Sequence, residues 1–372
     1  MWKKGLVYVL MLVCLLIFCI SYKIPDKQIN SVAEQDKKDS IVFVFAGDVM
    51  GHMPQIEAAY NRDSGIYDFR PCYQYISPYI KSADLAIANL EVPLAGKPYT
   101  GYPRFSSPDA LLDGALSAGF DVMQLANNHV ADKGNKGIEY SYAAVNAKTH
   151  SVGVYLNEAQ RDSLYPLIMN VKGVKIAILN CTFGTNGNAV YKPIIVNRID
   201  TAQIRHDVQR AKSRGARFVV LTIHWGTEYE LKANSIQTEL AHFFVNVGID
   251  LIIGAHPHVV QNFELISRAD STTVPVFYSL GNMVSNQYWR NSNGGILAKV
   301  TLDKTTCKVL HCNYLPFYVY KGKLAGKFQY YLIPTKAYMQ KKIECTLPLS
   351  NDSLLNLFDS DTHKRLSNIL EF

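Results

Sequence analysis

Acidic, amide and imidazole side chains follow several apolar stretches of the sequence, each at the point where the apolar run ends. The clearest case is IIGAHPHVVQNFE, residues 252–264, in which His256 and His258 flank Pro257 directly after an apolar run and a glycine. Alternate residues of such a loop point to the same side and proline stiffens it, so both imidazoles can reach one metal ion or one ion of a pair. Similar groups end other apolar runs, namely Asp48, Glu91, Asn128, His129 and His224.

The apolar runs before these groups are predicted to be β-strands buried on both faces, as in parallel or mixed sheets covered by helices. They occupy residues 41–48, 83–91, 121–129, 174–182, 217–226, 250–258 and 274–282. Residues 109–118 and 236–247 have helical patterns and end at a glycine, a common helix cap. This alternation predicts an α/β fold of layered mixed β-sheets flanked by helices. In such folds the carboxyl ends of the strands form the functional crevice.

The groups at these strand ends are oxygen and imidazole ligands, and none of them is a cysteine. Such a set suits divalent manganese, zinc, iron or magnesium better than a structural zinc held by cysteines. Each group alone has a simpler explanation: Asp48 as a helix cap, Glu91 as a turn carboxylate, Asn127 and Asn128 as turn formers, His224 as a packed histidine. Their coincidence at the ends of five predicted strands favours a metal site.

Two further histidines have more than one interpretation. His129 directly follows Asn128, so its side chain should point away from that amide, and we expect it to act as general acid or oxyanion stabiliser. The alternative is that His129 is one more metal ligand. His52 lies four residues after Asp48 at the start of a predicted helix. It is a candidate metal ligand, a contact for an anion at the helix N-terminus, or a surface histidine.

The first residues differ in kind from the rest. Lys3 and Lys4 precede an uncharged, mostly apolar run over residues 5–20, which predicts a single-pass membrane anchor at residues 1–22, followed by a polar linker over residues 23–40. A cleaved signal segment and a lipidated cysteine are the alternatives. All three readings place the body of the protein at the cell membrane or beyond it, outside the cytoplasm.

Composition excludes other classes of protein. The net charge of +7 is spread along the chain without a basic run of five residues, so no nucleic-acid-binding tail is predicted. The seven cysteines include no C-x-x-C pair, which argues against a zinc ribbon. Cys307 and Cys312 flank a predicted hairpin and are close enough in sequence to form a disulfide, although buried or free thiols are the simpler expectation.

Six motifs in one order resemble the CapA family of capsule-synthesis proteins: FAGDVMGH, ANLEVPLAG, YPRFSSPDALLDGALSAGFDVMQLANNHVADKG, IHWGTEY, GAHPHVVQ and YSLGNMV. That family is associated with making or exporting poly-γ-glutamate. The resemblance implies a four-layer fold similar to calcineurin-like metallophosphoesterases over residues 41–295. We expect residues 296–372 to add a β extension and a closing helix packed on the same domain.

The wider superfamily pattern can be carried over residue by residue. Asp48 matches its first acid, Glu91 stands where a carboxylate would bridge two metal ions, and Asn128 with His129 matches the N-H pair. His224, His256 and His258 match the later histidines. Met50 occupies the position of the histidine in the D-x-H motif, so His52 is its candidate replacement. The resemblance therefore implies two divalent ions held by Asp48, His52, Glu91, Asn128, His224, His256 and His258.

Two functions follow as hypotheses. The first is a metal-dependent hydrolase or acyl-transfer enzyme acting on glutamyl amide or phosphoester bonds, with His129 handling the proton and Arg104 and Asn127 binding an anionic substrate. Arg104 has a surface arginine as its simpler reading. The second is a non-catalytic accessory factor that binds an anionic polymer or a membrane-bound synthase subunit through a metal-stabilised site.

Overall fold

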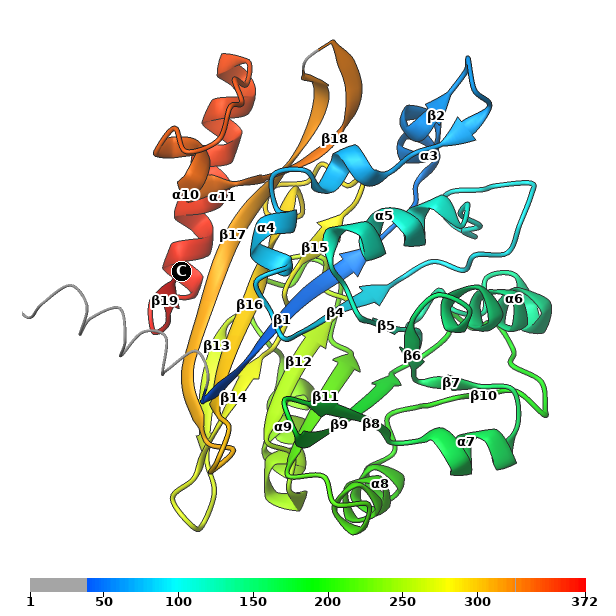
Figure 1. Ribbon diagram of the computed structural model, residues 1–372, viewed down its shortest axis with the longest axis vertical. Helices are drawn as coiled ribbons and strands as arrows, with labels where there is room; N and C mark the ends of the chain where they lie inside the picture. Colours follow the sequence, from blue (N-terminus) through cyan, green and yellow to red (C-terminus); the bar gives the residue numbers. More distant parts are fainter. Residues whose placement is uncertain (1–38, 325) are drawn as a thin grey trace, which may run out of the picture. The chain divides into compact units, whose positions relative to one another are not determined.

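Two large β-sheets lie face to face in the computed structural model, which describes residues 39–372 apart from residue 325 (Figure 1). The first has nine strands within this range, and its parallel part runs through β15, β1, β4, β5 and β6. The bounds of these five strands are Asn282–Val284, Ser40–Val49, Leu85–Leu90, Val122–Gln124 and His150–Val152. Strands β16 (Gly294–Asp303), β17 (Val309–Leu324) and β18 (Lys327–Pro334) extend it on the other side as an antiparallel set, and β19 (Leu370–Glu371) pairs with β17.

The second sheet has six strands in the described residues. Its four central strands are parallel: β9 (Val174–Thr182), β11 (Phe218–His224), β12 (Leu251–Ala255) and β14 (Thr273–Phe277). Antiparallel strands β8 (Leu167–Val171) and β13 (Phe263–Ser267) form its edges. Two short pairs complete the β-structure, β2 (Tyr60–Asn61) with β3 (Ile66–Tyr67) and β7 (Val154–Tyr155) with β10 (Ile195–Val196).

Helices flank the two sheets. The outer face of the first sheet packs on η1 (Arg70–Tyr73) and on α3, α4, α5 and α6, which span Met53–Ala59, Ser77–Ile80, Ala110–Ala118 and Gly134–Asn146. The second sheet packs on α8 (Thr201–Ser213) and α9 (Ser235–Val247), and α7 (Glu158–Leu164) lies beside β7. Near the C-terminus, α10 (Thr335–Met339) and α11 (Leu349–Arg365) pack on β17. The predicted class, layered mixed sheets flanked by helices, is confirmed.

Strand β1 shows why its sequence is apolar without interruption. The Phe43 ring stacks on Phe218 of the second sheet at 6.2 Å, so this face of β1 fills the space between the sheets. Val44 and Ala46 point to the opposite face, where they pack with the helices. A strand buried on both faces has no position for an outward polar side chain until it ends, and β1 ends at the buried Asp48 and Val49.

The predicted helix ends are confirmed at two glycines. Gly119 and Gly248 follow α5 and α9 with φ of 115° and 106°, the left-handed conformation that glycine adopts without a steric penalty. Strand β5 is shorter than the apolar stretch predicted, because the chain leaves the sheet after Gln124. The Ala126 amide then donates to the Asn180 side chain at 2.8 Å, which turns the following residues towards the sheet edge.

Two other expectations concern the domain boundary and the cysteines. Strand β16 crosses the domain boundary expected at residues 295–296, and the division into domains stays a prediction. The cysteines of the described range, Cys307 and Cys312 among them, are free thiols, so no disulfide joins that pair.

The predicted single-pass membrane placement is corrected. Within the described range, residues 39–372 without residue 325, no helix is both long and apolar enough to cross a membrane. The segment that carried the prediction, residues 1–22, lies outside the described residues, as does the expected linker up to residue 38. The structure gives the anchor no support, and the localisation that rested on it is withdrawn.

The approach of β1 to the segment before β15 can be tested at Gly47. A Cβ added there would lie 1.8 Å from the Gly281 carbonyl oxygen, so Gly47→Ala must push two backbones apart. We expect the free energy of unfolding to fall by about 1–3 kcal/mol or more, measured by urea denaturation. The matched control is Gly184→Ala, where the added carbon meets only Arg198 Nη2 at 4.0 Å. Equal stability of the two variants would contradict this packing.

Candidate metal centre

The carboxyl ends of strands from both large sheets meet at one place. Asp48 lies at the end of β1 and Glu91 follows β4, both in the first sheet. His224 ends β11, and His256 follows β12, in the second sheet. The parallel strands of each sheet run towards the same edge in Figure 1, so the two edges bring these side chains together.

These side chains form two clusters that share one carboxylate. Glu91, His224 and His256 offer ligand atoms that lie within 4.8 Å of one another, and so do Asp48, Glu91 and His258. The two histidines of the AHPH loop therefore divide between the clusters, instead of serving the same one. A carboxylate common to two histidine-containing clusters is the arrangement expected of a bridging ligand between two cations.

Two buried atoms of this centre lack a hydrogen-bond partner among the described residues. They are Glu91 Oε1 and His256 Nδ1. His224 Nε2 lies 3.3 Å from Glu91 Oε1 and His258 Nε2 lies 3.7 Å from it, as contacts rather than hydrogen bonds. Buried polar atoms are nearly always hydrogen-bonded, so atoms left free in a polar cluster fit the role of metal ligands. The residues present therefore fit a divalent metal.

Burial and neighbouring charges shift the pKa values of the two carboxyl groups in opposite directions. Glu91 is 0% exposed, and burial, followed by the nearby Asp48, raises the pKa of its carboxyl well above the usual value. Burial also acts to raise the pKa of Asp48, but hydrogen bonding and charge from His258 outweigh it and the pKa falls. The centre therefore holds one carboxylate that its own residues stabilise and one, Glu91, that needs a cation beside it.

Two histidines of the centre, His224 and His256, have pKa values below the usual value. Burial, with the charge of His256, lowers the pKa of His224 well below its usual value. Burial, with the charge of His258, lowers the pKa of His256 to about 3. Neutral imidazole is the form that binds a metal ion, so these pKa shifts favour binding rather than an ion pair with Glu91.

The AHPH loop reaches the centre by a strained backbone. His256 and His258 have φ of 101° and 57°, in the left-handed region that residues other than glycine seldom occupy. This conformation turns the two imidazoles towards different clusters. It is the kind of strain that proteins retain at functional sites.

Two amides that the sequence analysis left without a role hold the ligands in place. Asn89 donates to Asp48 Oδ1 at 2.8 Å, and its Nδ2 lies 3.3 Å from His224 Nδ1. Asn282 Oδ1 lies 3.0 Å from His258 Nδ1, which also lies 3.1 Å from Asp48 Oδ2. The signal was present: both asparagines stand at the ends of predicted strands, where polar residues are otherwise rare.

His129 lies beside the clusters without belonging to either. Its Nδ1 is 2.8 Å from Asp132 Oδ2, and its ring packs edge-on against Phe105 with centroids 4.7 Å apart. Both His129 and Asp132 are buried. Asp132 was missed in the sequence, although an acid three residues after a histidine is close enough to orient the imidazole.

The structure places the two predicted asparagines differently. Asn128 Oδ1 lies 2.9 Å from His224 Nε2, next to the cluster of Glu91, His224 and His256. Asn127 donates to the Leu90 carbonyl at 2.8 Å and accepts from the His129 amide at 3.1 Å. Asn127 thus ties the β4 and β5 ends together beneath the site, where it is buried away from solvent.

His52 and Arg104 lie outside the ligand clusters. His52 Nδ1 is 3.0 Å from Gln55 Oε1 and 3.3 Å from the Asn286 amide nitrogen, and neither cluster includes it. Arg104 is exposed and donates to Asn188 Oδ1 at 2.8 Å. Asn188 in turn donates to Asp132 at 3.3 Å, which connects Arg104 to the partner of His129.

An aromatic ring packs on two histidines of the centre. Phe183, on the segment after β9, packs on His256 with ring centroids 4.6 Å apart and stacks parallel to His224 at 6.2 Å. Phe183 itself is 44% exposed, so it forms part of the surface that a ligand would meet first. Nothing in the sequence around Phe183 distinguished it from a core residue.

A comparison with known families agrees with this geometry. The family model described as "Bacterial capsule synthesis protein PGA_cap" matches residues 42–287. This chain belongs to that family. Capsule biosynthesis protein CapA of Bacillus anthracis is 29% identical over 294 residues, covering 74% of this chain and 67% of that protein. PGA biosynthesis protein CapA of Bacillus subtilis (strain 168) is 31% identical over 245 residues, or 62% of this chain and 61% of that protein. The resemblance inferred from the motifs is confirmed.

Two solved structures are similar to this PGA_cap member. The NAD nucleotidase NadN of Haemophilus influenzae superposes with a TM-score of 0.50 at 15% identity, over 87% of this chain and 68% of that chain. The calcineurin-like phosphoesterase YfkN of Bacillus subtilis gives 0.44 at 13% identity, over 87% and 97%. At 15% identity the likeness to NadN concerns the fold alone.

This PGA_cap chain departs from the D-x-H pattern at Met50, and the structure shows where that side chain lies. Met50 is 2% exposed and packs in the core between the first sheet and its helices. Its side chain lies 4.0 Å from the Ser285 hydroxyl and takes no part in either ligand cluster. His52 does not fill the vacated position, so the clusters contain Asp48, Glu91, His224, His256 and His258 without a sixth residue from this segment.

Removing Asn282 tests whether this amide orients a ligand. Asn282→Ala leaves His258 Nδ1 without one of its two oxygen partners, so we expect divalent-metal affinity to fall about 10–100-fold, measured by competition with a chelator. Asn246→Ala, at an exposed position of α9, is the control and should bind metal normally. Unchanged affinity in folded Asn282→Ala would remove the orienting role.

Proposed function

We propose that this protein is a metal-dependent hydrolase of capsule or poly-γ-glutamate synthesis or export, acting on glutamyl amide or phosphoester bonds. The observation that carries the proposal is the Glu91 carboxylate, buried between two histidine-containing clusters with one oxygen left without a hydrogen bond. In a structural metal site the protein supplies all the ligands, whereas a catalytic site keeps one position open. The partly exposed Phe183 ring, which packs on His256, brings this centre close to the protein surface.

Two divalent ions would be held by Asp48, Glu91 and His258 and by Glu91, His224 and His256. When bound, they would supply Lewis acidity and favour an ionised water at neutral pH. The chain itself fixes the ligands: Asn89 and Asn282 orient Asp48 and His258, and the packed sheets exclude bulk water from all of them. The metal could be manganese, zinc, iron or magnesium.

His129 is proposed to move the proton. Its Nδ1 faces Asp132, so a neutral His129 donates there and presents Nε2 as the second ring nitrogen. Asp132 accepts from the Phe105 amide at 2.9 Å through the same oxygen, which keeps the carboxylate in place. A histidine whose Nδ1–H is held by a buried acid can accept a proton at Nε2 from the attacking water and then pass it to the leaving amine or alcohol.

The proposed substrate is anionic. Arg104 is exposed near the site and presents a guanidinium that can pair with a carboxylate or phosphate. The chain's excess of basic residues favours such a ligand. A glutamyl polymer end carries several carboxylates and an amide bond, and it satisfies both demands.

Met50 favours a second function. A buried methionine, Met50, stands where the superfamily pattern has a histidine. The centre therefore has one ligand fewer than that pattern, which favours binding without catalysis. In that case the protein would be a non-catalytic accessory factor that holds an anionic polymer or a synthase partner through a metal-stabilised site.

Replacing His129 separates the two functions. His129→Ala removes the proposed proton carrier but no member of either ligand cluster, so metal content should stay unchanged. Turnover of γ-glutamyl-p-nitroanilide or p-nitrophenyl phosphate should fall about 10²–10⁴-fold. Metal is measured by elemental mass spectrometry and turnover by absorbance.

His150→Ala is the matched control, since His150 is exposed at the start of β6. It should keep both properties. Turnover that survives His129→Ala would contradict the role of His129. Absence of turnover of both compounds by the metal-loaded wild type would favour the accessory function.

A further inference from the structure

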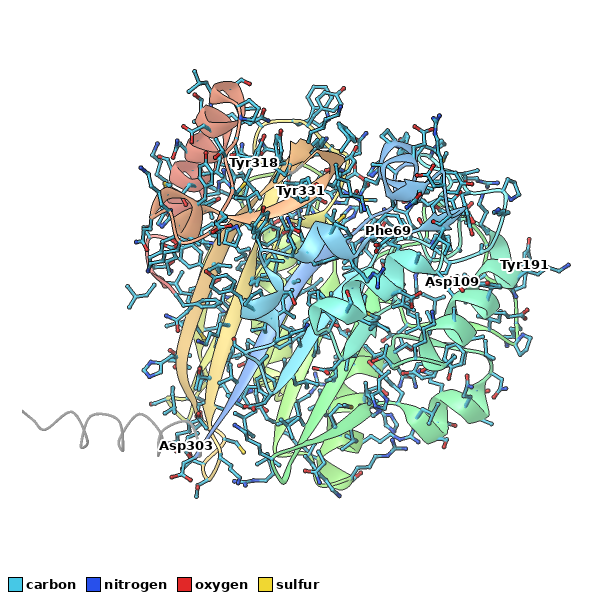
Figure 2. The ribbon with its side chains drawn as sticks, turned by 45° about the horizontal axis from the view of Figure 1, so that its top comes forward. Phe69, Asp109, Tyr191, Asp303, Tyr318 and Tyr331 are labelled. Carbon is cyan, nitrogen blue, oxygen red and sulfur yellow. The ribbon has the colours of Figure 1, made fainter. Side chains whose placement is uncertain are left out.

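A cavity of about 450 Å³ lies beside the C-terminal helix, apart from the metal centre. It opens where β16 begins at Gly294, opposite Tyr318, so that the following part of β17 is left beside the segment 287–293 and helix α11. Figure 2 shows Tyr318, one of its lining residues, on β17 next to the C-terminal helix. A cavity of this volume is large enough for a small organic molecule.

The cavity wall includes a cation without a counter-ion. Lys321 is half-buried, and none of the described residues places a carboxylate within ion-pair distance of it. Its Nζ donates to the backbone carbonyls of Asn286 and Gln287 at 2.7 and 2.9 Å, which leaves a third N–H, and it lies 5.7 Å from the centroid of the Tyr330 ring. Burial lowers the pKa of Lys321 to about 8. An incoming anion would relieve this cost of burial.

The other two charged residues of the wall form an ion pair with each other. Arg290 and Asp361 are bonded to each other at 2.9 and 3.0 Å, so they contribute no net charge. The lining therefore has a net positive charge from Lys321. The anion that fits has a single negative charge rather than several.

A buried acceptor lies in the same wall. Asn293 Oδ1 has no hydrogen-bond partner among the described residues. The Tyr318 hydroxyl accepts from Asn351 Nδ2 at 3.3 Å and also lies within hydrogen-bonding reach of the Asn293 side chain. The cavity thus offers a donor for an anion together with an acceptor for an N–H group.

The rest of the wall is apolar. Leu354, Leu357 and Phe358 of α11 line the cavity, and the first two are 44% and 39% exposed. Partly exposed leucines lie beside the Lys321 ammonium and Asn293 Oδ1. This combination suits a ligand with an aliphatic side chain and polar groups.

We propose that this cavity is a second binding site, which takes the carboxylate of a small N-acylated amino acid with an aliphatic side chain at Lys321 and its amide N–H at Asn293. The site does not depend on whether the metal centre is catalytic. Gln287 connects the two places, because its side chain accepts from Asn282, which in turn contacts His258.

The test uses N-acetyl-L-leucine as the probe, and its binding to the whole protein is measured by saturation-transfer NMR. We expect a dissociation constant on the order of 1 mM for the wild type, and no binding of the uncharged N-acetyl-L-leucinamide. Lys321→Met should weaken binding at least about tenfold. Lys323→Met is the matched control, on the same face of β17 but exposed and outside the cavity, and should bind as the wild type does.

Because Lys321 also holds the 286–287 backbone, a second variant guards against misfolding. Asn351→Asp puts a negative charge on the wall in the first turn of α11, where an acid is compatible with the helix. It should weaken binding of the probe as well. If Lys321→Met fails to fold, Asn351→Asp decides alone.

Three results would overturn the proposal. The first is that the wild type does not bind N-acetyl-L-leucine at about 20 mM. The second is that folded Lys321→Met and Asn351→Asp bind it as well as the wild type does. The third is that N-acetyl-L-leucinamide binds the wild type equally well. A His256→Ala, His258→Ala variant separates this site from the metal centre. Binding lost there but kept in Lys321→Met would place the probe at the centre and refute the second site.

Discussion

A carboxylate buried between two histidine-containing clusters is the constraint on which the arrangement of this site depends. Glu91 is fully buried, and Asp48, its nearest acidic neighbour, raises the pKa of its carboxyl further. A chain gains nothing in stability from such a group unless positive charge is bound beside it. The surrounding residues supply the other ligands for that charge, with neutral histidines from the second sheet on one side and Asp48 with His258 on the other.

The fold makes this possible by bringing the carboxyl edges of two parallel sheets together. Neither sheet could build the centre alone, because the first contributes the acids and the second the imidazoles. The junction requires close backbone approach: Gly47, one residue before Asp48, leaves no room for a side chain against Gly281. At the same junction Asn282 pairs with Asp48 in register and also meets His258. Packing of the sheets and orientation of the ligands are therefore set by the same few contacts.

Much of the site could be predicted because strand ends are visible as polar residues after apolar runs. Asp48, Glu91, His224, His256 and His258 were found in that way. Asn89, Asn282 and Asp132 were given no role, because an amide or acid near other candidates has no property in the sequence that distinguishes an orienting residue from a turn former. The division of His256 and His258 between two clusters depends on positive φ angles, which no residue type in AHPH requires.

Other features depended on three-dimensional contacts. His52 is only two residues from Met50, which made it the candidate replacement for the histidine of the D-x-H motif. In the structure it lies at the start of α3, where its side chain contacts Gln55 and the Asn286 amide. Phe183 and the cavity beside α11 bring together residues from distant segments, which periodicity does not reveal. The apolar N-terminal run lies outside the described residues, and within those residues no helix is long and apolar enough to cross a membrane.

The most direct test of the shared-carboxylate centre is the metal content of the purified protein after reconstitution with manganese or zinc. Elemental mass spectrometry should find about two equivalents per chain, and both should be lost when Glu91 is replaced in Glu91→Gln, since that residue belongs to both clusters. No bound metal in the folded wild type, or two equivalents retained in Glu91→Gln, would contradict the account.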